Sequence, residues 1–372
     1  MNKTILIFTA YYLPHLGGIE RYLDNLMHEL VKLKVRVILV TSNYNDDKKH
    51  EVQDGIEIYR IPVFNIFKNR YPIFKLNSEE RGVLKELDKE KIDAIIVNTR
   101  FHLSSHIGAK YGKKRSIPVF LIEHGSQYVT LDNKFIDFFA NRYEDFLTWK
   151  IRNKITAWYG ASPSSCNWLK HFNIEAAGYW NNGINTNLKL PEKKKHQGIN
   201  FLYAGRLIKQ KGVGNILEAF TELEKKYNNI KINIAGSGAE LDYYKENYKS
   251  KNIKFLGQID FSKLLEYFSK SDVFLYPSLW PEALASSVLE AGLMEVSTIG
   301  TTQPGIIDIL DENNGILIDG SVEELKESME LLIKDKELGD KLAKQLHKDV
   351  LKKFAWNNNA KKVLKDIDKY LK

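Results

Sequence analysis

The sequence has little cysteine and lacks any long apolar run. Cys166 is its one cysteine, so no disulfide can form within the chain, and we expect a cytoplasmic protein. No apolar stretch reaches the ~18 residues that a membrane-spanning helix needs. The opening MNKTILIFTAYYLPHLGG resembles a secretory signal, but it has no small-x-small cleavage site and runs into a Gly-Gly turn. We therefore interpret it as a first buried strand.

The net charge of +8 lies mostly in the first half of the chain. Residues 1–185 hold 26 Lys and Arg against 20 Asp and Glu, whereas residues 186–372 hold 29 against 27. Nucleic acid, anionic lipid or a phosphorylated ligand would each suit a basic half, and a lysine-rich solvated surface explains it equally well. Because no nucleic-acid-binding motif is present, we expect no nucleic-acid partner.

Short apolar runs alternate with amphipathic segments along the whole chain. A length of 372 residues with 43% hydrophobic and 27% charged residues predicts two globular domains. The expected strands are TILIFT, VRVILVT, IEIYRI, DAIIVN, PVFLIE and ITAWYG, then INFLYAG, IKINIAG, IKFLG, DVFLYP, STIGT and GILID. Residues 21–34 and 215–227 are typical of helices. The pattern predicts an α/β protein with one doubly wound parallel sheet in each half, divided within residues 181–198.

Ligands of such sheets bind beyond the carboxyl ends of the strands, and suitable residues follow the strands here. Gly17 and Gly18 precede a helix and form either an anion-binding turn or an ordinary tight turn. In AGRLIKQKG (204–212), Arg206 and Lys211 lie between a strand and a helix. A planar cation, a point charge and helix N–H groups suit a diphosphate.

The segment PEALASSVLEAG (281–292) carries two carboxylates in an apolar setting. Glu282 falls in the loop beyond a strand, and Glu290 lies eight residues later. Either Glu290 forms a capping box with Ser287, or it accepts hydrogen bonds from a ligand. Two carboxylates on either side of an anion site suit a sugar nucleotide, which joins a sugar, a diphosphate and a ribose.

Three weaker signals follow other strands. The turn GSG (236–238) is a nucleotide contact or a plain turn, and FLGQID (255–260) contacts a base or forms a plain loop. In EHGS (123–126), His124 is a candidate sugar contact or a structural histidine.

In this order, the motifs resemble those of family 4 glycosyltransferases, which have the GT-B fold of two facing Rossmann-like domains. The motifs are GGIE, EHG, NNGIN, GRLIKQKG, AGSG, FLG, PEALASSVLEAG and the final FAWNNNAKKVLKDI. The resemblance implies an acceptor-binding domain at 1–182, a nucleotide-sugar domain at 183–352 and a helix at 353–372 that packs back on the first domain.

The resemblance also implies roles for individual residues. Arg206 and Lys211 would hold the donor diphosphate, Glu282 the sugar hydroxyls and Glu290 the ribose, while His124 would contact the sugar from the acceptor side. The other expected donor contacts are Gly17, Gly18, Gly236, Gly238, Ile259, Ala283, Leu284, Ala285 and Ser286.

The implied reaction is a retaining, metal-independent transfer from a UDP-sugar or, next, a GDP-sugar to a glycan or lipid-linked acceptor of the cell envelope. The protein would then act mainly by positioning and charge stabilisation. An Asp-x-Asp, Asp366-Ile-Asp368, lies in the expected final helix, and we interpret it as solvated surface rather than a metal site.

The sequence departs from the family pattern at four positions. Ala283 and Ala285 replace common glycines, Glu295 begins a replacement of the usual Gly-x-Pro, and Asn185 replaces an aspartate. These departures bear on sugar identity and activity. A non-catalytic GT-B partner subunit and a sugar-nucleotide 2-epimerase are the alternative functions.

Two segments of the basic half mix aromatic and cationic residues. They are FNIFKNRYPIFK (64–75) and FIDFFANRYEDFLTWKIRNK (135–154). We expect either peripheral contact with an anionic inner leaflet and a lipid-linked acceptor, or a covered loop and a core helix.

Overall fold

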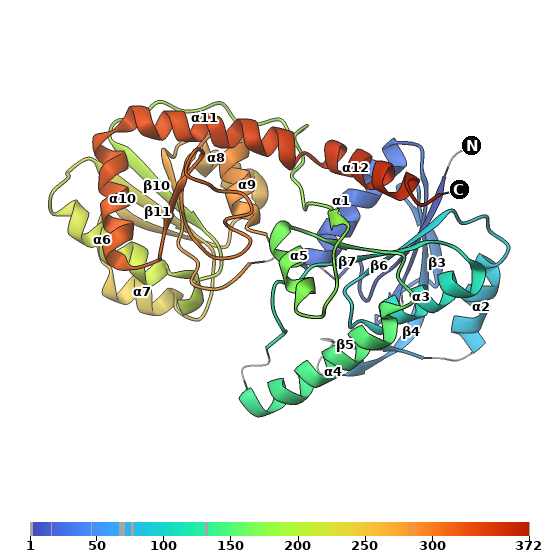
Figure 1. The fold of residues 1–372 in the computed structure, drawn as a ribbon. Coiled ribbons are helices and arrows are strands. Elements are labelled where there is room, and N and C mark those ends of the chain that lie inside the picture. The colour runs from blue at the N-terminus through green and yellow to red at the C-terminus, as the bar shows by residue number, and fades with distance from the viewer. Residues whose placement is uncertain are drawn as a thin grey trace. The chain divides into compact units, whose positions relative to one another are not determined.

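A computed structural model gives the fold of the chain (Figure 1). It describes residues 3–15, 17–45, 47–66, 71–75, 78–130, 133–282 and 284–371. The chain divides into unit 1, Met1–Asn182 with Trp356–Lys372, and unit 2, Gly183–Ala355. Each unit is a sheet covered by helices, so the α/β class is confirmed.

Unit 1 is built on a sheet with the order β3-β4-β2-β1-β6-β7-β8-β9, with β5 paired to β4. Its strands are β1 Thr4–Phe8, β2 Arg36–Asn43, β3 His50–Gln53, β4 Ile56–Ile66, β5 Tyr71–Phe74, β6 Ala94–Asn98, β7 Val119–Glu123, β8 Ala157–Gly160 and β9 Gly178–Tyr179. Its helices are α1 Gly18–Lys32, α2 Ser78–Leu87, α3 Leu103–Arg115, α4 Lys134–Arg152, α5 Pro163–Lys170 and α12 Trp356–Asp368.

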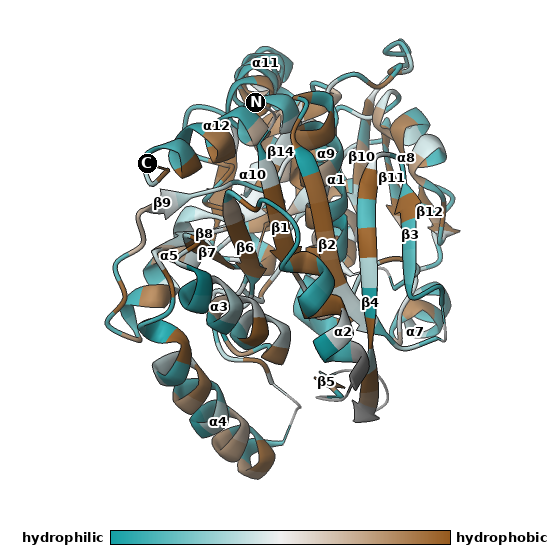
Figure 2. Cartoon of the chain, turned by 90° about the vertical axis from the view of Figure 1, so that its right-hand side faces the viewer, coloured by the Kyte–Doolittle hydropathy of each residue, from teal (hydrophilic) through white to brown (hydrophobic). Residues whose placement is uncertain are grey.

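Both faces of the unit 1 sheet are buried. Along β1, Ile5 and Ile7 pack with α1 and α12 on one face, whereas Leu6 and Phe8 pack toward α2, α3 and α5 on the other. This explains why the central strands β1, β2 and β6 are apolar runs, drawn mostly brown in Figure 2.

Two of the unit 1 pairings differ from the expected parallel sheet. β3 and β5 both pair antiparallel with β4. Antiparallel strands need only a short connection, and neither sequence carries a strong strand pattern: β3 is the polar run HEVQ, and β5 is the short run YPIF, which contains a proline. The segment 64–75 therefore contains the end of β4 and all of β5, while its Lys68 and Arg70 lie outside the described residues.

Unit 2 is a parallel sheet with the order β12-β11-β10-β13-β14-β15. Its strands are β10 Ile199–Ala204, β11 Ile230–Ala235, β12 Ile253–Gly257, β13 Val273–Tyr276, β14 Ser297–Thr301 and β15 Ile316–Ile318. Its helices are α6 Val213–Glu224, α7 Leu241–Asn247, α8 Phe261–Phe268, α9 Ser286–Leu293, α10 Val322–Lys334 and α11 Lys336–Lys353, with the 3-10 turn η1 at Lys209–Lys211. The two faces are buried against α8, α9 and α11 on one side and α6, α7 and α10 on the other.

The last two helices divide between the units. α11 continues to Lys353 and belongs to unit 2, so the final helix begins at Trp356 rather than at residue 353. Trp356 and Ile367 of α12 are buried in the same core as α1. Asp366 is also buried there and accepts a hydrogen bond from the indole N–H of Trp180 at 3.1 Å. The interpretation of Asp366 as solvated surface is therefore wrong, whereas Asp368 is about half exposed.

Candidate functional site

The loops after β10 and β13 meet because these two strands are neighbours in the unit 2 sheet. Gly212 has a φ of 69° and follows η1, and a Cβ placed on it would lie 2.2 Å from the carbonyl oxygen of Pro277. Only glycine fits this left-handed and crowded position. The glycine thus lets the Arg206–Lys211 loop approach the end of β13.

Lys211 and Glu282 form an ion pair across these loops. The side chain of Lys211 is 10% exposed and that of Glu282 is 17% exposed, although the two residues are 71 positions apart. The Ser278 hydroxyl donates to Oε1 of Glu282 at 2.9 Å, and the Lys211 ammonium lies 5.7 Å from the centre of the Tyr276 ring. Burial and the nearby Glu282 charge raise the pKa of Tyr276, so that phenol stays protonated.

Arg206 lies on the same loop, immediately beyond β10. Its side chain is exposed, and its carbonyl oxygen accepts a hydrogen bond from the Tyr203 hydroxyl at 2.9 Å. The backbone is therefore anchored while the guanidinium is available to a ligand. Arg206, Lys211 and Glu282 thus come from the ends of two adjacent strands, where ligands of parallel sheets bind.

The loop that carries Glu282 lies before α9 and is held by residues that follow β14. The N–H groups of Glu282 and Ala285 donate to the carbonyls of Pro304 and Gly305 at 2.9 and 3.3 Å. Gly305 has a φ of 80°, and its Cβ position would be 2.3 Å from the Glu282 carbonyl oxygen. These two N–H groups are thus already engaged, and Ala283 lies outside the described residues.

Of the two alternatives for Glu290, the capping box with Ser287 is wrong. α9 begins at Ser286, its N-cap is Ala285 and no side chain caps it. Ser287 and Glu290 therefore lie inside the helix, with Glu290 half-buried in its second turn. The helix starts early because its backbone is fixed by the Gly305 contact rather than by a serine.

The departure at Glu295 lies at the other end of α9. Glu295 has a φ of 53°, and the N–H of Val296 donates to the carbonyl of Ala291 at 2.9 Å. This is the left-handed helix ending that normally takes glycine. The substitution therefore affects helix termination rather than the Glu282 loop. Asn185 accepts the N–H of Asn187 through its side-chain oxygen, as an aspartate also can.

The glycines after β11 pack against the Arg206 loop. Gly236 has a φ of 134°, and its Cβ position would lie 1.8 Å from the Gly205 carbonyl oxygen; that of Gly238 would lie 2.2 Å from the Leu207 oxygen. Close backbone approach thus explains both glycines. Ile259 and Leu284 are partly buried against the core that includes α8 and α9.

In unit 1, the N-terminus of α1 already holds a carboxylate. Gly17 is the N-cap, and its N–H donates to the buried carboxylate of Glu20, whose Oε1 is 3.4 Å from His15 Nδ1. Burial raises the pKa of Glu20. Gly17 has no room for a Cβ beside Glu20, whereas Gly18 faces open space. The signal for Glu20 was its position three residues after the N-cap.

His124 follows β7 and is buried. Its Nε2 lies 3.0 Å from Oδ1 of Asn98, whose amide nitrogen donates to the Phe8 carbonyl, so Nε2 carries the proton. The His124 ring also meets Tyr22 edge-on at 4.9 Å. Burial lowers the pKa of His124 to about 3, so the ring is neutral and presents Nδ1 as an acceptor.

The α4 helix of unit 1 has an exposed aromatic face. Its large exposed side chains are Phe135, Ile136, Phe138, Phe139, Tyr143, Phe146 and Trp149. Trp149 is 72% exposed, so the expectation of a core helix is wrong for this face. The buried charged residue Arg100 lies inside the same unit and escaped the sequence analysis, although it lies two residues after the strand run DAIIVN.

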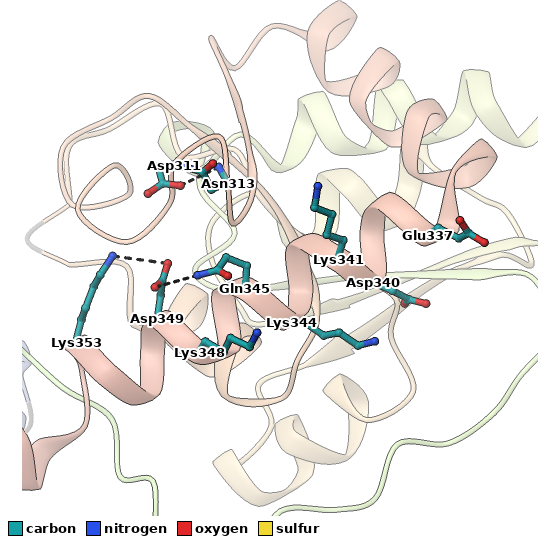
Figure 3. A pocket seen from close by; sticks show the side chains of 10 residues that line it. All are labelled: Asp311, Asn313, Glu337, Asp340, Lys341, Lys344, Gln345, Lys348, Asp349 and Lys353. Atoms are coloured by element: carbon teal, nitrogen blue, oxygen red, sulfur yellow. Dashed lines mark hydrogen bonds and ion pairs between the residues drawn. The ribbon is translucent and has the colours of Figure 1, made fainter.

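A surface hollow of about 940 Å³ lies between α11 and the 311–313 loop of unit 2 (Figure 3). Its lining alternates acidic and basic side chains, such as Asp340 and Lys344, and contains no predicted site residue. Within the described ranges, no three His, Cys, Asp or Glu side chains gather as metal ligands. No helix among those same residues is long and apolar enough to cross a membrane.

Two families match the chain in succession. Glycosyltransferase Family 4 matches residues 16–188, and Glycosyl transferases group 1 matches residues 186–349. An uncharacterized glycosyltransferase of Methanocaldococcus jannaschii is 28% identical, with 98% of each chain covered.

Solved structures show the same fold. Sucrose-phosphate synthase from Thermosynechococcus elongatus aligns with a TM-score of 0.78 at 17% identity, over 99% of each chain. Anabaena HepE in complex with UDP-glucose aligns with a TM-score of 0.70 at 16% identity, over 98% of this chain and 99% of that one. The protein is a family 4 glycosyltransferase with the GT-B fold.

Proposed function

We propose that the protein is a retaining hexosyltransferase that uses a nucleotide-sugar donor, a UDP-sugar first and a GDP-sugar next, without a metal ion. Its acceptor is a glycan or a lipid-linked glycan of the cell envelope. The observation that carries the proposal is the Lys211–Glu282 pair beside Arg206 at the ends of β10 and β13.

The pair supplies both kinds of contact that a donor needs. Lys211 and Arg206 are a point charge and a planar cation, which suit the two phosphates of a diphosphate. When a diphosphate attracts Lys211, the Glu282 carboxylate, which still accepts a hydrogen bond from Ser278, can also accept hydrogen bonds from sugar hydroxyls. Glu290 in the second turn of α9 then accepts hydrogen bonds from the ribose hydroxyls, and the N–H groups of Leu284 and Ser286 donate hydrogen bonds to the sugar.

The test is release of nucleoside diphosphate from UDP-, GDP- and ADP-sugars, with EDTA present. We expect Lys211→Met and Glu282→Gln to lower kcat by about 10²–10³, the usual effect of removing a preorganised charge. Lys209→Met is the matched control, because Lys209 is an exposed lysine on the same 3-10 turn. Its activity should stay within about twofold of wild type.

The outcomes separate the possible functions. Turnover of one donor that depends on Lys211 but not Lys209 supports the transferase. Binding without turnover, even with envelope glycolipid acceptors added, favours the non-catalytic partner subunit, and product NMR showing inversion refutes retention. Equal activity of Lys211→Met and wild type refutes the proposed donor site.

The α4 surface supports a membrane-bound acceptor. Beside its exposed aromatic face, Lys154 has a pKa lowered by burial and by the neighbouring Lys113, Lys150 and Lys110. Such a group of cations next to exposed aromatic rings suits an anionic membrane surface. We propose that unit 1 docks peripherally on the cytoplasmic leaflet through α4.

Co-sedimentation with vesicles of 0–40% anionic lipid tests this docking. We expect binding to rise with anionic lipid and to fall with salt, and Phe138→Ser/Phe139→Ser to weaken it. Phe261→Ser, at an exposed phenylalanine of unit 2, is the control. Binding that ignores lipid charge and salt would refute the electrostatic part, and full binding by the double variant would refute the role of α4.

A further inference from the structure

The loop of residues 124–129, between β7 and α4, is fixed at both ends by carboxylates. It begins with His124 and leads to α4, which starts at Lys134. The N–H of Gly125 donates to Oε1 of Glu123 at 2.9 Å, and the N–H of Val129 donates to Oε1 of Glu144 at 3.3 Å. Glu123 belongs to β7 and Glu144 to α4, so the loop is anchored to a strand at one end and to a helix at the other.

Arg100 joins these two carboxylates. Its guanidinium Nη1 is 3.1 Å from Oε1 of Glu123, and its Nη2 is 2.5 Å from Oε2 of Glu144. Its backbone N–H is also 3.3 Å from Oε2 of Glu123. One side chain thus holds the strand-side and the helix-side anchor of the loop at a set separation.

The surroundings make this arrangement hard to replace. Arg100 is completely buried, and its guanidinium lies 4.3 Å from the centre of the Phe172 ring and 5.5 Å from that of Trp168. In so apolar a place, the guanidinium needs a carboxylate partner, because an unpaired buried charge is strongly unfavourable. The preceding Thr99 has a φ of 67°, which is rare for a β-branched residue. The backbone therefore accepts strain at the residue that orients Arg100.

We infer that Arg100 is a positioning residue, which sets the place of His124 relative to α4 through Glu123 and Glu144. This inference rests on the proposed function, with α4 docked on the membrane that holds the acceptor. It also takes for His124 the role that the family resemblance implies, contact with the sugar from the acceptor side. Arg100 itself is fully buried and touches no substrate. Its effect is to keep the His124 loop in one conformation.

Hydrogen exchange at single-residue resolution tests the loop directly. In Arg100→Met we expect the amides of Gly125 and Val129 to exchange at least tenfold faster, with the amides of β2 unchanged. Exchange in Arg100→Lys should be intermediate between wild type and Arg100→Met, since an ammonium lacks the planar fork with which the guanidinium faces both Glu123 and Glu144. Unchanged exchange at both amides would overturn the inference.

Two further variants keep the test decisive. If Arg100→Met does not fold, Glu144→Ala removes only the helix-side anchor and should speed exchange at Val129 but not at Gly125. Equal acceleration at both amides would contradict the inference that Glu123 anchors Gly125 and Glu144 anchors Val129. The matched control is Arg115→Met, because Arg115 lies at the end of α3, before β7, and pairs with Asp88. Its exchange at Gly125 and Val129 should equal that of wild type.

Kinetics then link the loop to the reaction. With the donor found by the nucleotide-sugar panel, Arg100→Lys should lower kcat at least tenfold while donor KM changes less than threefold. Donor KM should change little because Arg206 and Lys211, the proposed diphosphate contacts, lie in unit 2 and keep their places. A normal kcat with a fast-exchanging loop would overturn the catalytic consequence. If no donor is turned over, the proposed function fails, but the exchange experiment still decides whether Arg100 fixes the loop.

Discussion

Glu144 should make the stability of unit 1 depend on pH in the direction opposite to an ordinary carboxylate. Burial raises the pKa of its carboxyl group to about 7, and Arg100 opposes this rise. The other groups that face it are Glu123, Asp145 and the phenol of Tyr71. Because one guanidinium faces two carboxyl groups, protonation of Glu144 relieves an excess of buried negative charge.

The sign and size of the effect follow from linkage. The pKa of Glu144 is higher in the folded state than in the unfolded chain, so the folded state binds the proton more tightly between these two values. The stabilisation of the folded state that this tighter proton binding provides is complete below about pH 4.5 and is lost as the pH rises through about 7. A difference of about 2.5 pKa units corresponds to roughly 3 kcal/mol of unfolding free energy.

Glu144→Gln removes this titration and keeps the shape of the side chain. We expect the free energy of unfolding of the variant, minus that of wild type, to rise by about 2–3 kcal/mol as the pH goes from 5 to 8. Urea unfolding at several pH values, followed by tryptophan fluorescence, measures it, since five of the six tryptophans belong to unit 1. A difference between the two proteins that stays constant with pH would refute the reasoning.

Three further substitutions test other contacts. Gly236→Ala should unfold or severely destabilise unit 2 and abolish nucleotide binding, because its Cβ would lie 1.8 Å from the Gly205 oxygen; a stable variant in calorimetry would contradict this. Glu290→Gln should raise donor KM, since Glu290 lies inside α9 and does not form the capping box; a lower urea midpoint with normal KM would argue for a structural role. Asp366→Ala should cost about 1–3 kcal/mol in urea unfolding, because it leaves the buried Trp180 indole N–H without an acceptor.

The sequence alone determined the parallel framework. Runs such as TILIFT and INFLYA are apolar on both faces, and that property can be read without knowing any contact. It also placed Arg206, Lys211 and Glu282 beyond strands, because the ends of parallel strands are where the backbone leaves the core. The antiparallel strands β3 and β5 escaped, since each has only four residues, β3 is polar and β5 contains a proline.

Only the tertiary structure decided which of these residues meet. Lys211 and Glu282 are 71 positions apart and pair because β10 and β13 are neighbours, an order that no local pattern states. The N-terminus of α1 proved to hold Glu20, and Arg100 proved to join a strand to a helix. Local sequence reports how each residue prefers to be solvated and which backbone angles it tolerates. Which buried charges form ion pairs depends on the order of the strands in the sheet and on the dielectric around the charges, and both arise only when the whole chain is packed.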